Sequence, residues 1–114
     1  MEKIARQAYL YDFYGELLTE HQKTVYEDAV LNDMSLSEIA AELGISRQGV
    51  HDLIKRCDKI LNGYEEKLHL VERFFETKKL AEKIRSLAEE ETQNGVSAKM
   101  KEISSLAGQI IEKL

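Results

Sequence analysis

The sequence predicts an all-α protein, and three observations support this fold class. The chain of 114 residues contains no proline, the residue that most strongly interrupts a helix. It is rich in leucine, isoleucine, alanine, glutamate and lysine, most of which favour helices. Its apolar residues recur at steps of three and four along most of the chain. We therefore expect amphipathic helices joined by short turns.

The first helix is expected to run from about residue 2 to Leu17 or Leu18. It contains a crowd of aromatic residues, Tyr9, Tyr11, Phe13 and Tyr14. Such rings either stack on bases or fill a core, and helical spacing in a short domain favours the core. The residues of this segment expected in the core are Ile4, Ala5, Ala8, Tyr11 and Leu18.

A second helix is expected to begin after Leu18, because Thr19 and Gln22 have the spacing of a capping box. Its side chains expected to face inward are Val25, Tyr26, Ala29, Val30 and Leu31. Asn32 and Asp33 then end the helix.

The next segment has the pattern of a helix-turn-helix motif. Ser35 and Glu38 form a second capping box, so a short helix should begin at Leu36. Gly44 ends that helix by supplying a left-handed backbone conformation, and Ile45 is expected to enter the core. The apolar face of the short helix is predicted to comprise Leu36, Ile39, Ala40 and Leu43.

Ser46 caps the second helix of the motif. Its buried stripe is predicted to comprise Val50, Leu53, Ile54 and Cys57. This register turns long polar side chains outward, where they suit base edges and phosphates in a major groove. The candidate nucleic-acid-binding residues are Ser46, Arg47, Gln48, His51, Lys55, Arg56 and Lys59. The alternative is an ordinary helical hairpin within a bundle.

The rest of the chain is expected to be a helical extension. The stripe of the second motif helix continues to Val71, with Asn62-Gly63 as its weak point, and a further helix follows Thr77. Asn94-Gly95 should end that helix, and Ser97 should cap the last one. We expect domains at 1–62 and 63–114. The apolar residues of the extension either fold back on the long helix or pair with a second chain, and of these alternatives we favour packing that includes a homodimer.

The net charge of −5 is unusual for a domain that binds phosphate backbones, because such domains are usually basic. Residues 46–60, however, carry four cations against Asp52 and Asp58, which leaves a small positive patch. Residues 1–6 lack the apolar core of a signal peptide, and no apolar run is long enough to span a membrane. A cytoplasmic location is expected.

No residue pattern indicates an enzyme, a cofactor or a metal site. Glu66 and His69 have the spacing used in di-iron bundles, but such sites need a second copy of the pattern. Gly44-Ile45-Ser46 lacks the glycine that a nucleophile elbow requires two residues after its serine. Cys57 is the only cysteine and lies on an apolar stripe, which favours a buried, inert thiol.

The segments 18–23, 35–40 and 45–50 resemble region 4 of bacterial sigma factors, and the whole chain resembles the YlxM family of small bacterial proteins. The resemblance implies a sigma region 4-like fold and DNA contact through Arg47, Gln48, His51, Lys55 and Arg56. It also implies a regulatory role in the signal recognition particle pathway. An adaptor that binds the GTPase or RNA of that particle without binding DNA is the alternative, which the acidic balance and Asp52 favour.

Overall fold

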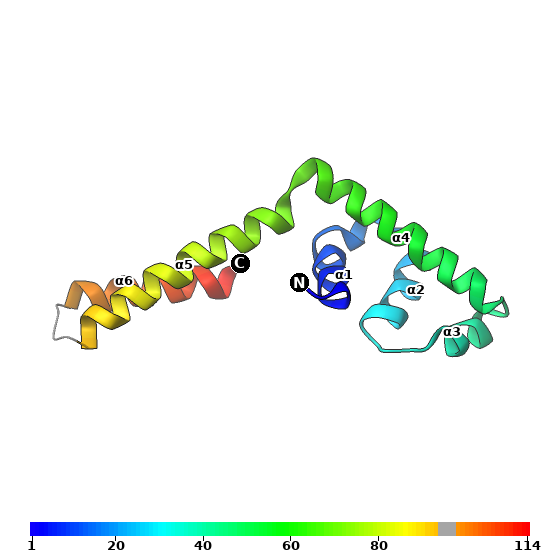
Figure 1. Ribbon diagram of the computed structural model, residues 1–114, viewed down its shortest axis with the longest axis horizontal. Coiled ribbons are helices and arrows are strands. Elements are labelled where there is room, and N and C mark those ends of the chain that lie inside the picture. Colours follow the sequence, from blue (N-terminus) through cyan, green and yellow to red (C-terminus); the bar gives the residue numbers. More distant parts are fainter. Residues whose placement is uncertain (94–97) are drawn as a thin grey trace. The chain divides into compact units, whose positions relative to one another are not determined.

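The computed structural model describes the backbone of residues 1–93 and 98–114, and the side chains of residues 1–90 and 98–114. Over this part of the chain the protein is all-α and has no strand, which confirms the predicted fold class (Figure 1). The elements are α1 (Lys3–Tyr14), the 3-10 turn η1 (Gly15–Leu17), α2 (Glu20–Val30), α3 (Leu36–Leu43), α4 (Arg47–Leu68), α5 (Leu70–Gln93) and α6 (Ala98–Lys113).

The chain forms two compact units, Met1–Val71 and Glu72–Leu114. The first unit holds α1 to α4 and the first residues of α5. The second holds the remainder of α5 together with α6. The helix-turn-helix segment therefore lies entirely in the first unit. Asn62-Gly63, the expected weak point, lies inside α4, which continues without interruption to Leu68.

The long helix α4 is the spine of the first unit and packs against α1, α2 and α3 (Figure 1). Val25 of α2, Ile39 and Ala40 of α3 and Val50 of α4 form a buried cluster within the helix-turn-helix. This cluster joins α2, α3 and α4 through one shared set of apolar contacts.

Further along α4, Cys57 and Leu61 are buried together with residues of α1 and α2, including Leu10, Tyr14 and Tyr26. Tyr14 is fully buried and Tyr11 partly buried, so these rings fill the core as expected.

Polar bonds inside the first unit fix how its helices sit on α4. Asp58 accepts hydrogen bonds from Gln7 Nε2 of α1 at 3.0 and 3.1 Å and from Tyr26 Oη of α2 at 2.6 Å. Glu65 Oε1 accepts from Tyr14 Oη at 2.6 Å. Because buried polar groups are costly when unpaired, these bonds favour one arrangement of the helices over others.

The helix boundaries at the motif follow the predicted caps. Thr19 and Ser35 each form a full capping box, with Gln22 and Glu38 respectively. Gly44 has the left-handed backbone, at φ 68°, and Ser46 Oγ accepts from Gly49 N at 3.0 Å. These local signals therefore place both helices of the motif.

The break after α4 differs from the prediction, which placed it at Thr77. His69 adopts a left-handed conformation at φ 55° and separates α4 from α5. The N–H groups that open α5 are satisfied from the core: Leu70 N donates to Tyr14 Oη at 3.2 Å and Val71 N to Glu65 Oε1 at 3.0 Å. Tertiary contacts thus end the helix where no glycine or proline does.

Four apolar residues that were predicted in the core are exposed. Ile4 is 61% exposed, Phe13 37%, Leu31 49% and Ile45 42%. Ile4 lies in the first turn of α1, ahead of the residues that this helix buries, which are Gln7, Leu10 and Tyr14. The Ile45 side chain lies close to Gly49, because a Cβ added at Gly49 would be 3.5 Å from Ile45 Cδ1. Ile45 therefore covers the turn from its outer side.

The second unit is an antiparallel hairpin of α5 and α6, in which α6 runs back beside α5 (Figure 1). Its buried residues among those described are Ala81, Ala88 and Ala107. Small side chains allow the two helix axes to approach closely. The expected turn at Asn94-Gly95 and the expected cap at Ser97 lie outside the described residues. None of the described helices has the length and apolar character needed to cross a bilayer.

Candidate nucleic-acid interface

The candidate interface is the outer surface of α4 in its first three to four turns. α3 and α4 are joined by the short turn 44–46, whose geometry is fixed by Gly44 and by the Ser46 cap. One side of α4 packs against the buried cluster of the motif, so the opposite side of α4 faces outward. This is the geometry of a helix-turn-helix, in which the second helix is presented to the major groove.

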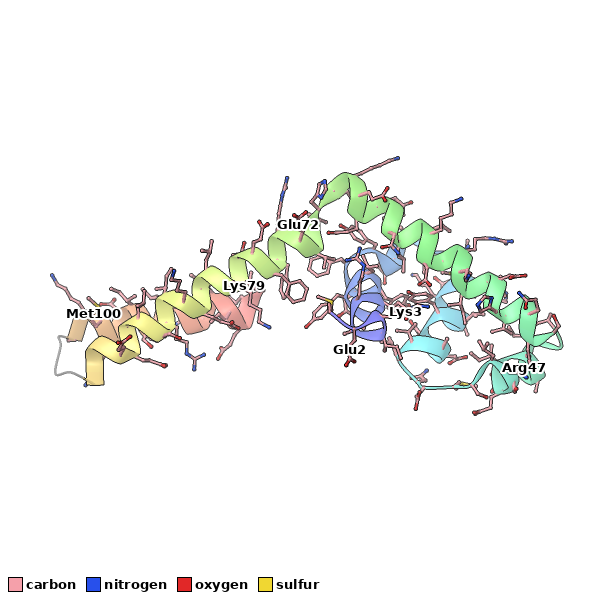
Figure 2. The ribbon with its side chains drawn as sticks, viewed as in Figure 1. Glu2, Lys3, Arg47, Glu72, Lys79 and Met100 are labelled. Atoms are coloured by element: carbon pink, nitrogen blue, oxygen red, sulfur yellow. The ribbon has the colours of Figure 1, made fainter. Side chains whose placement is uncertain are left out.

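The structure exposes most of the candidate residues. Ser46, Arg47, Gln48, Lys55, Arg56 and Lys59 are exposed, and His51 is half-buried. Figure 2 shows Arg47 at the start of α4, beside the turn from α3. The Ser46 hydroxyl already serves as the helix cap. We define the reading face as Arg47, Gln48, His51, Lys55, Arg56 and Lys59.

The charge of the reading face is more positive than the sequence indicated. Asp58 was counted among the outward charges of residues 46–60, but its carboxylate is directed to Gln7 and Tyr26 in the core. Within residues 46–60 the structure therefore leaves four exposed cations and one exposed carboxylate, Asp52. This concentration of positive charge suits a polyanion although the whole chain is acidic.

Asp52, a carboxylate that would repel phosphates but could accept from a cytosine amine, also makes contacts beside the reading face. Its Oδ1 accepts a hydrogen bond from Gln48 Nε2 at 2.9 Å and lies 3.8 Å from His51 Nδ1. Gln48 and Asp52 are four residues apart, so helical spacing alone could have indicated this pair. The bond orients the Gln48 amide at the centre of the reading face.

His51 is half-buried, and its two ring nitrogens have different surroundings. Nδ1 is shielded from solvent and has no hydrogen-bond partner among the described residues. The ring lines a shallow hollow of about 400 Å³ with Leu36, Arg47 and Gln48. The hollow joins the start of α3 to the start of α4, so a ligand on the reading face would contact both helices.

The aromatic hydroxyls of the first unit belong to the core rather than to the reading face. Burial and a bond to the Asp58 carboxylate raise the pKa of Tyr26. Burial and a bond to Glu27 likewise raise the pKa of Tyr11. Both tyrosines therefore stay neutral donors, and neither contributes charge to the interface.

Comparisons with known proteins agree with this geometry. The YlxM / p13-like helix-turn-helix family, UPF0122, matches residues 1–103. The chain belongs to this family. A UPF0122 protein of Bacillus cereus strain AH187 and one of Bacillus anthracis strain A0248 are each 43% identical to it over 114 residues, which is all of this chain and 98% of each relative. The family assignment supports nucleic-acid binding through the helix-turn-helix.

Within the described residues no group of histidine, cysteine, aspartate or glutamate side chains could hold a metal ion. His69 sits at the left-handed break after α4, so Glu66 and His69 do not share a helical face. Cys57 is fully buried, and burial raises the pKa of its thiol. A thiol in this setting is a poor nucleophile.

Proposed function

We propose that the chain is a regulatory DNA-binding protein that reads the major groove of a duplex with the reading face of α4. The observation that supports the proposal most directly is that α4 exposes four cationic side chains and Gln48. The opposite side of the same helix packs into the core of the helix-turn-helix.

The position of each residue along α4 suggests its role. Arg47 and Gln48 lie in the first turn, the part of a recognition helix that contacts base edges. Arginine pairs with guanine and glutamine with adenine through two hydrogen bonds. Lys55, Arg56 and Lys59 lie further along, where they can contact phosphates and fix the register.

A gel-shift series tests this assignment. We expect Arg47→Ala with Lys55→Ala to weaken binding of a short duplex at least about tenfold at low salt, because the variant loses a base contact and a phosphate contact. The slope of log affinity against log salt should fall by about one, since one of the two lost contacts is to a phosphate. The matched control is Lys79→Ala with Lys101→Ala, which removes two exposed cations elsewhere.

Equal binding by the reading-face variant and the parent protein would show that α4 is not the contact surface. An equal loss in the control would show that only total charge matters. Because the target sequence has to be found first, the duplex is chosen from a pooled DNA and RNA selection with the purified protein.

A second candidate function is a protein-interaction adaptor that binds the GTPase or RNA of the signal recognition particle without binding DNA. The net charge of −5 and the carboxylate of Asp52 on the reading face favour it. It predicts capture of the chain by the purified GTPase, with no duplex retained at low salt. Retention of a duplex by the parent protein, lost in the reading-face variant, would decide for DNA.

A further inference from the structure

Among its described residues, the second unit fully buries no large apolar side chain. The buried side chains among its described residues are Ala81, Ala88 and Ala107, each contributing a single methyl group. Units this short normally need a disulfide, a metal or association with another chain. The one cysteine lies in the first unit, and no metal cluster exists in the described part of the chain. Association remains as the source of stability.

Both helices of the hairpin expose a stripe of large apolar residues. Leu80 is 64% exposed, Leu87 53% and Leu106 51%. The full set, with exposures between 39% and 64%, is Leu80, Ile84 and Leu87 of α5, Ile103, Leu106 and Ile110 of α6, and Leu114 directly after α6. We call this set the hairpin stripe. Scattered exposed leucines are normal, but a contiguous set marks an interaction site.

The two halves of the hairpin stripe lie on the same side of the hairpin. In α5, Leu80 and Ile84 are one residue before and three residues after the buried Ala81. In α6, Leu106 and Ile110 have the same two offsets from the buried Ala107. Equal offsets place the two pairs at the same angle around their own helix axes, measured from the side on which α5 and α6 touch. Because α6 runs antiparallel to α5, this angle brings both pairs to the same side of the hairpin.

The other side of the hairpin is polar. A hollow of about 320 Å³ there is lined by Arg85 and Glu89 of α5 and by Ser105, Gln109 and Glu112 of α6. Each helix therefore has one line of contact with its neighbour, one apolar side at about a right angle to it, and one polar side. This is the pattern of a helix in a four-helix bundle, which contacts two neighbours.

We propose that the hairpin stripe is covered by the same stripe of a second copy of this chain, so that two hairpins form a four-helix bundle. The exposed apolar area is on the order of 600 Å² per copy, close to the ~800 Å² per partner of a standard interface. Exposed charges of both signs border the stripe, namely Lys83, Lys99, Lys113, Glu76, Glu90 and Glu102. Two copies facing each other therefore meet without a net repulsion, as a two-fold interface requires.

The oligomeric state of the full chain tests this proposal without reference to DNA. Light scattering or sedimentation should give twice the chain's 13.1 kDa for the parent protein. The variant Leu106→Glu with Ile110→Glu should shift to the single mass, because it buries four carboxylates in the bundle. The matched control is Ser105→Glu with Gln109→Glu, which places the same charges one residue earlier on the polar side and should keep the double mass.

Helix content is measured on all three proteins by circular dichroism. If the stripe variant has the mass of one chain, the proposal is supported whether or not helix content falls. The side chains of Leu106 and Ile110 are exposed in a single copy, so their replacement affects folding only if a second copy covers them. The unfolding temperature of the parent protein should also rise with its concentration. A single mass for the parent, a double mass for the stripe variant, or a single mass for the control would each overturn the proposal.

Discussion

At the scale of single residues, Asp52 places a carboxylate among the cations of the reading face. It holds the Gln48 amide through the 2.9 Å bond and lies beside His51. A carboxylate at this position repels phosphates, yet it can also orient Gln48 or accept from a cytosine amine. On the proposed interface, Asp52 would lower the affinity for phosphates while holding the Gln48 side chain in place.

Asp52→Asn should raise DNA affinity by a few-fold, because the variant removes a like charge and keeps an acceptor for Gln48. The gain should shrink as salt is added. Asp12→Asn, an exposed carboxylate on α1, is the control and should change affinity little. An unchanged affinity for Asp52→Asn at low salt would place phosphates away from this part of α4.

Tyr14 shows how one hydroxyl can connect three elements. Its Oη donates to Glu65 of α4 and accepts from Leu70 N at the start of α5. Tyr14→Phe should lower the free energy of unfolding by about 1 to 3 kcal/mol, since both groups lose a buried partner. Urea unfolding measures the change. Tyr64→Phe, at a half-buried tyrosine of α4, is the control and should cost less.

At the scale of elements, the glycines of the first unit have opposite roles. Gly44 has φ 68°, which L side chains rarely adopt, whereas Gly63 lies inside α4 with open space around it. One glycine therefore ends a helix, and the other weakens one.

Alanine at these two positions should change stability in opposite directions. We expect Gly44→Ala to cost about 1 kcal/mol because of backbone strain. Gly63→Ala should gain about 0.5 to 1 kcal/mol, because alanine favours a helix interior. Thermal or urea unfolding of the two variants measures both values. A gain for Gly44→Ala would contradict the left-handed turn.

Sequence predicted the elements where the signal was local. The capping boxes at Thr19 and Ser35 and the stop at Gly44 are each encoded within four residues, and all three were found. The break at His69 was missed because its cause is tertiary: the groups that satisfy α5 come from Tyr14 and Glu65. Apolar spacing also assigned Ile4 and Leu31 to the core, since a stripe read from sequence is wider than the real contact.

The outward register of the reading face was predicted for the same local reason, because helical spacing sets which side chains oppose the buried ones. The inward turn of Asp58 could not be predicted this way. Its partners Gln7 and Tyr26 are 51 and 32 residues away in the chain. DNA contact by the reading face stays a prediction that binding experiments have to test.

At the scale of the whole first unit, three tyrosine hydroxyls each donate to a carboxylate on another helix. Tyr11 joins α1 to Glu27 of α2, Tyr14 joins α1 to α4, and Tyr26 joins α2 to α4. Burial is the first cause that raises the pKa of all three, and the carboxylate bond is the second. Folding therefore favours the neutral form of each ring.

This predicts a loss of stability in alkali. A pKa that folding raises contributes stability that is complete below the unfolded value, about 10 for tyrosine, and is lost as pH rises toward the folded value. The urea midpoint should therefore fall as pH increases above about 10. In Tyr26→Phe the fall should be shallower, although the variant is less stable at neutral pH. If the urea midpoint falls equally in the parent protein and in Tyr26→Phe, the loss of stability in alkali comes from groups other than Tyr26.

The complete burial of Cys57 has a practical consequence for studying the protein. Because reagents cannot reach this thiol, the native chain should not react with maleimide dyes or thiol-directed spin labels. A cysteine introduced at an exposed position can therefore be labelled selectively while Cys57 stays in place. A chain with two added thiols then gives a distance within one unit by energy transfer or pulsed resonance, and a chain with one added thiol gives the distance between two copies.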